Sequence, residues 1–249
     1  MKIAVVTGAS SGIGEAVARA LSARGWRCVL LARREEKLQA LAEELDAEWE
    51  RCDVADRAEV EEVAARVQQR HPQIALLVNN AGVPGRVGFF DADPERIETL
   101  MRINYLGSVW CLRAFLPGLE ASGSADVVNV VSVAGSVGAG PYSASKHAQL
   151  AFSRSATAEL APRGIRVHTV NPGYVESEGF PQRTKLPRPL RRVVIDPPDV
   201  ARHIVRVLER NRRETYVPSY YRIVPLAQAL LPGLVARAQA RVSGARRPK

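Results

Sequence analysis

Tyr142 and Lys146 are four residues apart in a segment whose pattern predicts a helix, so their side chains are expected on one face. A phenol with its usual pKa of about 10 is a poor proton donor and a worse base at neutral pH. A fixed ammonium group beside it stabilises the phenolate and brings that pKa toward the working range of a general acid or base. The pair therefore predicts proton transfer, although this spacing also occurs by chance on helix surfaces.

A glycine-rich turn at residues 7–14 follows an apolar run and leads directly into a predicted helix. Glycines let the backbone approach a pyrophosphate closely, and the N–H groups at a helix start attract its charge. The turn predicts a dinucleotide site, the alternative being a purely structural turn. Its expected contacts are Gly8, Ser10, Ser11, Gly12, Ile13 and Gly14.

The end of the second predicted strand indicates which dinucleotide binds. An acidic residue there would bond a free ribose 2′-hydroxyl, whereas Arg33 and Arg34 can neutralise a 2′-phosphate. The sequence therefore predicts NADP(H) in preference to NAD(H), unless the arginines are simply exposed at a helix start. Asp53, after the third strand, either accepts a hydrogen bond from the adenine amino group or caps the helix that begins near Asp56.

These residues must be positioned by strands and helices that alternate along the chain. Continuous apolar runs predict buried strands at 3–7, 27–31, 74–78, 126–132 and 165–170. Amphipathic segments predict helices at 13–23, 35–45, 57–69, 94–116, 143–160 and 198–209. Because this alternation builds parallel sheets, the expected fold is one doubly wound α/β domain. Its sheet has about seven parallel strands, helices cover both faces, and ligands bind at the carboxyl ends of the strands.

The ordered motifs resemble those of the short-chain dehydrogenase/reductase family, which has a Rossmann fold. The resemblance extends from Lys2 to about Pro218. It rests on the glycine turn, residues 79–82, Asn104, Ser132, the Tyr142 and Lys146 pair, and residues 171–173, which occur in the family's order.

The resemblance implies a role for each matching residue. Tyr142 is the general acid/base, and Lys146 lowers its pKa and bonds the nicotinamide ribose. Ser132 holds the substrate oxygen, and Asn104 anchors a water in a proton relay behind Lys146. Further cofactor contacts are implied for Val54, Asn80, Ala81, Gly82, Pro172, Gly173, Val175 and Ser177.

One spacing departs from the family. Relatives usually separate the serine and the tyrosine by thirteen positions, whereas ten separate Ser132 from Tyr142. Either the loop at 135–141 is tighter with the same endpoints, or Ser132 is displaced. We retain Ser132 as the oxygen-binding residue, with Ser136 as the weaker candidate because it lies deeper in the loop.

Composition and charge exclude several classes of protein. The 249 residues are 46% hydrophobic and 24% charged, which excludes wholesale disorder and a disulfide-stapled miniprotein. Three widely spaced cysteines and the absence of a secretory pattern predict a cytoplasmic protein without a metal site. The formal net charge of +9 is uneven, because residues 183–249 hold 16 basic and 4 acidic side chains.

The basic segment ends in two predicted amphipathic helices. Apolar residues recur there at helical spacing: Ile223, Leu226, Leu230, Leu231, Leu234, Val235, Ala238 and Val242. Either these helices seal the core or a subunit interface, or they form a lid over an apolar substrate or a peripheral contact with anionic lipid. Arg246, Arg247 and Lys249 would assist the lipid contact.

The sequence as a whole predicts an NADP(H)-dependent oxidoreductase that interconverts a carbonyl and a secondary alcohol, with a lipophilic small molecule as substrate. Residues 1–221 would form the cofactor-binding and catalytic domain, with 176–198 as a substrate loop and 222–249 as a basic extension. The family implies a homodimer or homotetramer. The alternative is an NADP-binding sensor or structural protein with little activity, and nucleic-acid binding is not expected.

Overall fold

The computed structural model describes residues 1–85, 87–178, 181–186 and 188–244. Within these residues, seven parallel strands form one sheet in the order β3-β2-β1-β4-β5-β6-β7. The predicted parallel α/β fold of about seven strands is confirmed. The strands are β1 (Ile3–Thr7), β2 (Arg27–Ala32), β3 (Glu48–Arg51), β4 (Leu76–Asn79), β5 (Ala125–Val130), β6 (Ile165–Pro172) and β7 (Glu214–Val217).

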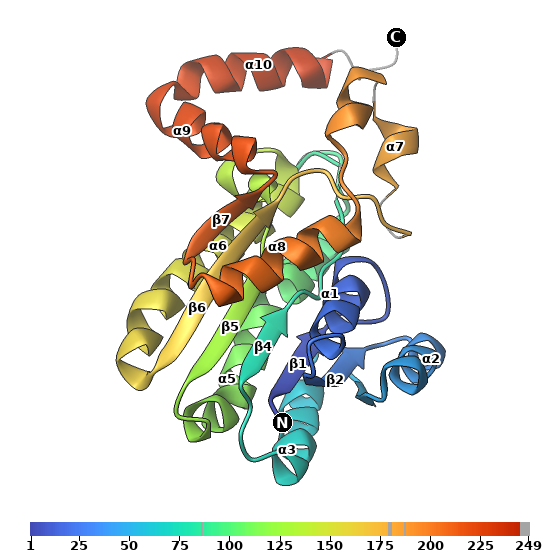
Figure 1. Cartoon of the computed structure of the whole chain (residues 1–249). Helices are drawn as coiled ribbons and strands as arrows, with labels where there is room; N and C mark the ends of the chain where they lie inside the picture. Colours follow the sequence, from blue (N-terminus) through green and yellow to red (C-terminus); the bar gives the residue numbers. More distant parts are fainter. Residues whose placement is uncertain (86, 179–180, 187, 245–249) are drawn as a thin grey trace.

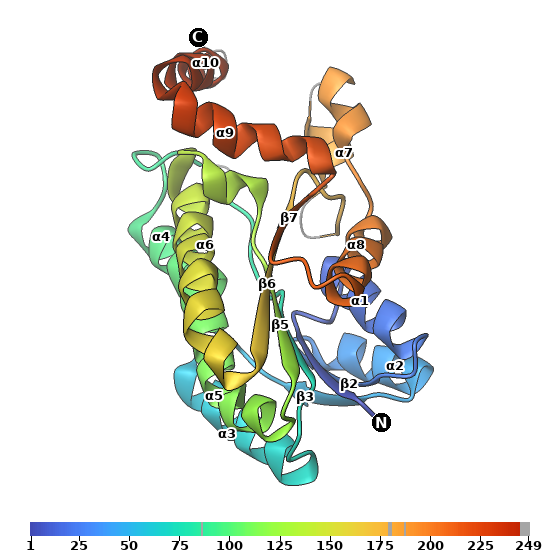
Figure 2. The same ribbon diagram turned by 60° about the vertical axis from the view of Figure 1, so that its left-hand side comes forward.

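Helices cover both faces of the sheet (Figure 1; Figure 2). One layer contains α1 (Gly12–Ser22), α2 (Glu35–Leu45) and α8 (Pro197–Glu209), and the other contains α3 (Arg57–Arg70), α4 (Pro94–Met101), α5 (Gly107–Ala121) and α6 (Gly140–Leu160). Successive strand residues point to opposite faces, so Val5 joins one hydrophobic core and Val6 the other. The continuous apolar strands therefore reflect burial on both sides.

The sheet has a switch point between β1 and β4. The chain builds β2 and β3 outward from β1, then returns to place β4 on the other side of β1. Thr7 joins the two strands, because its Oγ1 donates to Val78 O (3.2 Å) and accepts from the N–H groups of Asn80 and Ala81 (both 3.0 Å). Ligands of open α/β sheets bind outside such a switch point.

Local boundaries differ from the sequence prediction at three places. The predicted helix 94–116 consists of α4, a π-helical turn at Arg102–Leu106, and α5. The predicted strand 126–132 ends at Val130, and Ser132 caps a 3₁₀ turn at Val133–Ser136. The short strands β3 and β7 were not among the five predicted apolar runs, although a third strand was expected before Asp53. That strand is β3, which is polar at alternate positions.

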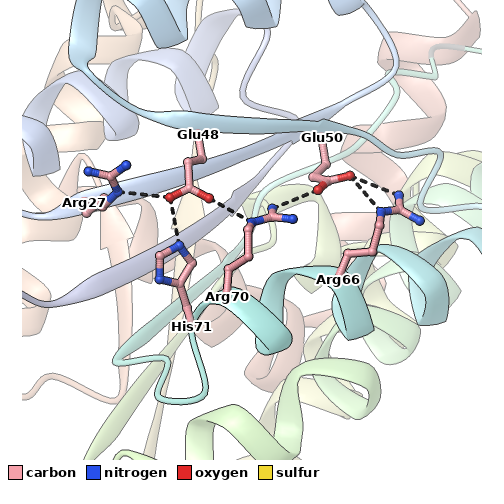
Figure 3. Close-up of polar contacts among 6 residues, drawn as sticks. All are labelled: Arg27, Glu48, Glu50, Arg66, Arg70 and His71. Atoms are coloured by element: carbon pink, nitrogen blue, oxygen red, sulfur yellow. Dashed lines mark hydrogen bonds and ion pairs between the residues drawn. The ribbon is translucent and has the colours of Figure 1, made fainter.

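The edge strand β3 is held by a network of ion pairs (Figure 3). Its glutamates Glu48 and Glu50 bind cations from the neighbouring β2, from α3 and from the residue after α3: Arg27, Arg66, Arg70 and His71. Burial alone would raise the pKa of Glu48, but the hydrogen bonds from His71 and Arg27 outweigh it and lower that pKa. The network fixes the strand that leads to Asp53.

The predicted loop 176–198 contains the short helix α7 (Gln182–Lys185) and a 3₁₀ turn at Arg188–Val193. Its Gly179, Phe180 and Pro187 lie outside the described residues. The Glu176 carboxylate accepts hydrogen bonds from the backbone N–H groups of Gln182 and Arg183 (2.9 and 2.8 Å), which ties the start of α7 to the end of β6.

The two predicted C-terminal helices are present as α9 (Ile223–Leu230) and α10 (Pro232–Gly244), after a 3₁₀ turn at Ser219–Arg222. They lie beyond the carboxyl ends of the strands (Figures 1 and 2). The alternative in which they seal the core is wrong for this chain, because their leucines are largely exposed. Arg246, Arg247 and Lys249 lie outside the described residues. No described helix is long and apolar enough to cross a membrane.

Candidate active site

The glycine turn has the geometry of a phosphate cradle. Gly8 and Gly12 have φ of 65° and 60°, which favour glycine, and a Cβ on Gly14 would overlap the Gly8 carbonyl. Asn80 braces the turn, because its Nδ2 donates to Thr7 O (3.0 Å) and Gly8 O (3.3 Å). Among the described residues, no side chain caps the N-terminus of α1 at Ser11. The first N–H groups of α1 therefore face a position suited to an anion.

Arg34 lies against this turn. Its Nη2 donates to Ser11 Oγ (2.6 Å) and Ser10 O (3.2 Å), and its Nε donates to Ser10 Oγ (3.2 Å). Arg34 and Lys37 both pair with Glu178 from the loop at 176–198, at 3.3 and 2.7 Å. The hydrogen bond from Lys37 is the largest cause that lowers the pKa of Glu178. Two cations are thus gathered where the sequence predicts a ribose phosphate.

A cavity of about 70 Å³ opens beside the turn. Asp53 contributes to its wall, and its Oδ1 accepts from Ala55 N (3.0 Å) while Arg33 lies 3.7 Å away. The alternative that Asp53 caps α3 is wrong, because Asp56 accepts from the first N–H groups of that helix. Six predicted cofactor residues line the cavity: Gly8, Arg33, Asp53, Val54, Ala81 and Gly82.

Asn104 is buried in the π-helical turn and joins two parts of the site. Its Oδ1 accepts from Val83 N (2.8 Å), and its Nδ2 donates to Val83 O (3.1 Å) and Ser145 Oγ (3.0 Å). These bonds connect the chain after β4 to α6, the helix that carries the predicted acid/base pair. The side chain of Asn104 therefore fixes the distance between the two segments.

The shortened loop keeps its endpoints together. Ser143 Oγ lies against the carbonyl groups of Ala134 and Val137, which holds the loop against α6. Burial raises the pKa of Tyr142, and the nearby Ser132 hydroxyl opposes that rise. The lowering of this pKa by Lys146 stays a prediction. Ser136 is buried deeper, beside Tyr216.

Lys146 has two partners on its buried side. Its Nζ donates to Val130 O (3.1 Å) and to Gln149 Oε1 (2.8 Å), and Gln149 Nε2 donates to Ser108 Oγ (2.8 Å). Burial lowers the pKa of Lys146 to about 7. Sequence reasoning missed Gln149 and Ser108. The available signal was a polar residue three positions after Lys146, on the same helix face.

The end of β6 supplies the predicted nicotinamide contacts. Pro172 closes the strand, and a Cβ on Gly173 would overlap the ring of Tyr221, which the sequence analysis did not single out. Val175 is buried and pairs with Ile195 in an isolated bridge. Ser177 lies over the glycine turn, since a Cβ on Gly12 would be 3.4 Å from Ser177 Cβ. The predicted nicotinamide contacts therefore lie beside the glycine turn.

Of the three cysteines, Cys52 lines the cavity beside the glycine turn, whereas Cys28 and Cys111 do not. Cys28, Cys52 and Cys111 are buried and free, and burial raises the thiol pKa of Cys28 and Cys52 to about 12. Among the described residues, no group of three or more His, Cys, Asp or Glu side chains is placed to hold a metal ion.

Comparison with known proteins identifies the family. The short chain dehydrogenase model matches residues 2–186. A Streptomyces coelicolor protein named as a candidate ketoacyl reductase is 37% identical over 186 residues, which cover 71% of each chain. The structure of an actinorhodin polyketide ketoreductase with NADPH has a TM-score of 0.76 and 32% identity, covering 82% of this chain and 89% of that one. A short-chain dehydrogenase from Streptomyces avermitilis has a TM-score of 0.82 and 29% identity, covering 99% and 98%. The chain therefore belongs to the short-chain dehydrogenase family.

Proposed function

We propose that the protein is an NADP(H)-dependent oxidoreductase that interconverts a carbonyl group and a secondary alcohol. The supporting observation is that Tyr142 and Lys146 lie one turn apart on α6, with the Ser132 hydroxyl near the Tyr142 phenol. When bound, NADPH supplies the hydride. The raised pKa of Tyr142 keeps its phenol protonated at neutral pH, so Tyr142 donates the proton to the substrate oxygen in reduction. Ser132 orients that oxygen.

The charges and the cradle fit NADP(H). The backbone around Gly8 and Gly14 leaves no room for side chains, which suits the close approach of a pyrophosphate. Arg34 lies beside Ser11, and Lys37 shares the Glu178 carboxylate with it, so both offer cations to a 2′-phosphate. The related actinorhodin ketoreductase was crystallised with NADPH. At the other end of the cofactor, Lys146 would bind the nicotinamide ribose.

A lipophilic substrate is supported by apolar side chains near Tyr142. Val87, Phe89 and Phe90 are exposed, and the Val87 carbonyl lies against the start of α6 at Gly140. These groups give an apolar compound a surface to bury on binding. Assembly as a homodimer or homotetramer, a cytoplasmic location and the division into residues 1–221 and 222–249 stay predictions.

The proposal is tested with a panel of ketones and NADPH or NADH, read by loss of cofactor absorbance. We expect NADPH-dependent reduction of apolar ketones, abolished by Tyr142→Phe. The control is Tyr220→Phe, which removes the hydroxyl of an exposed tyrosine. Tight NADPH binding without turnover on any compound would overturn the proposal and favour the sensor.

A further inference from the structure

The C-terminal helices expose an apolar surface that the body of the protein does not cover. Its five large side chains are 52% to 76% exposed: Ile223, Leu226, Leu230, Leu231 and Leu234. Single exposed leucines are common on protein surfaces. Five large apolar side chains within two short successive helices form a contiguous apolar surface, and its exposure to water is energetically unfavourable. We call these five residues the apolar strip.

The apolar strip lies in a segment whose ionisable side chains are all basic or tyrosine. From Thr215 to Lys249 the sequence holds no Asp or Glu, while it holds Arg222, Arg237, Arg241, Arg246, Arg247 and Lys249. Arg222 and Arg237 are exposed and form no ion pair with any described residue. Arg222 also lines a groove of about 920 Å³ along α8 and β7, where Arg202, Arg206, Arg210 and Arg212 outnumber the acidic Asp199 and Glu214. Positive charge therefore extends from the start of α9 to the surface along α8 and β7.

A second copy of the chain is a poor match for this surface. A symmetric dimer uses the same patch on both subunits, so the arginines of one copy would meet those of the other without a carboxylate from the segment. An anionic bilayer matches both properties, because its headgroups attract arginine while its acyl chains accept leucine. We propose that α9 and α10 dock the protein on the surface of an anionic lipid membrane.

The same segment stands over the candidate active site. α9 packs on the turn Val133–Ser136, which follows Ser132, and Tyr221 lies on Gly173. In both views α9 and α10 lie beyond the carboxyl ends of the strands (Figures 1 and 2). Docking through the apolar strip thus turns this end of the molecule toward the bilayer. Delivery of a lipophilic substrate from the lipid rests on the proposed function, whereas docking itself does not.

The test is co-sedimentation of the full chain with vesicles, without cofactor or substrate. One set contains equal parts phosphatidylglycerol and phosphatidylcholine, and the other contains phosphatidylcholine alone. We expect binding to the anionic vesicles that weakens as salt rises. Replacement of Leu230, Leu231 and Leu234 by Ser should abolish it. Arg222→Gln with Arg237→Gln should weaken it about tenfold or more, since each arginine near such a surface contributes about 1 kcal/mol.

The matched control is Arg24→Gln with Arg113→Gln, which removes two exposed arginines elsewhere and should leave binding unchanged. Thermal melting verifies that each variant is folded. Equal binding to both vesicle types, or to neither, would overturn the proposal. So would a dimer in size-exclusion chromatography that the leucine substitutions dissociate while vesicle binding is absent. Because the assay needs no turnover, these results leave the oxidoreductase proposal unaffected.

Discussion

Lys146 Nζ donates a 2.8 Å hydrogen bond to Gln149 Oε1, three residues further along α6. The amide of Gln149 is itself fixed, because its Nε2 donates to Ser108 on α5. A neutral oxygen therefore stabilises an ammonium group whose pKa burial lowers to about 7. This contact gives Gln149 an influence on the charge of Lys146 without contact with the substrate.

Gln149→Leu is expected to lower the pKa of Lys146 further, because the charged form loses an acceptor. A hydrogen bond to a charged group contributes about 1.5–3 kcal/mol, which corresponds to about one to two pH units. The alkaline limb of kcat/KM should move to lower pH by that amount. Gln149→Glu should move it to higher pH, since a carboxylate favours the ammonium. Shifts in the same direction for both variants would leave Gln149 with a packing role only.

Ser132→Ala should reduce kcat/KM for ketone reduction by about 10²-fold, the usual cost of losing a positioned donor. The substitution also removes the hydroxyl that opposes the rise in the pKa of Tyr142. Steady-state kinetics measure the effect. Ser136→Ala is the matched control and should retain near-normal turnover. The reverse ranking of the two variants would show that the shortened loop has moved the oxygen-binding role to Ser136.

Glu178→Gln should tighten NADPH binding, because Glu178 occupies the cations that a 2′-phosphate needs. It pairs with Arg34 and Lys37 at the surface, where solvent screens the pairs and keeps their contribution small. The expected gain is up to about fivefold in Kd, measured by fluorescence titration. NADH, which lacks that phosphate, should be unaffected. Glu36→Gln, an exposed carboxylate on α2, controls for general charge, and an equal gain there would contradict the assignment.

Asp126→Asn should destabilise the protein at neutral pH. Burial alone would raise the pKa of Asp126, but hydrogen bonds from Arg166 and His168 outweigh it and lower that pKa. A carboxyl with a lowered folded pKa contributes stability above its unfolded pKa of about 3.9 and loses it as the pH falls toward the folded value.

We expect Asp126→Asn to reduce the free energy of unfolding by about 2 kcal/mol near neutral pH, and by less at about pH 3. Urea denaturation at each pH measures the free energy of unfolding of the variant and of the unsubstituted chain. A loss of the same size at neutral pH and at about pH 3 would assign the effect to packing. The exposed Glu36→Gln again serves as the control.

Gly173→Ala should raise the KM for NADPH and displace the C-terminal segment, because the new methyl group overlaps the ring of Tyr221. Adding Tyr221→Ala in the same chain should largely restore the KM for NADPH and the position of the C-terminal segment. Limited trypsin cleavage at Arg222 measures displacement of the segment. Independent, additive effects of the two substitutions would contradict direct contact between them.

The sequence predicted those parts of the site that depend on local pattern. The glycine turn and the four-residue spacing of Tyr142 and Lys146 specify geometry within one turn or one helix. The contact of Arg34 with Glu178 was not predictable, because it joins segments 144 residues apart. The direction of the Tyr142 pKa also escaped prediction, since burial depends on tertiary packing.

The short loop before Tyr142 has a consequence for chimeras in which segments are exchanged between related proteins. It lies flat against α6, and α9 packs on the turn at its start. A helix from the far end of the chain thus covers the turn at which this loop begins. We therefore expect a chimera with a longer loop to fold well only when the terminal helices are replaced with it.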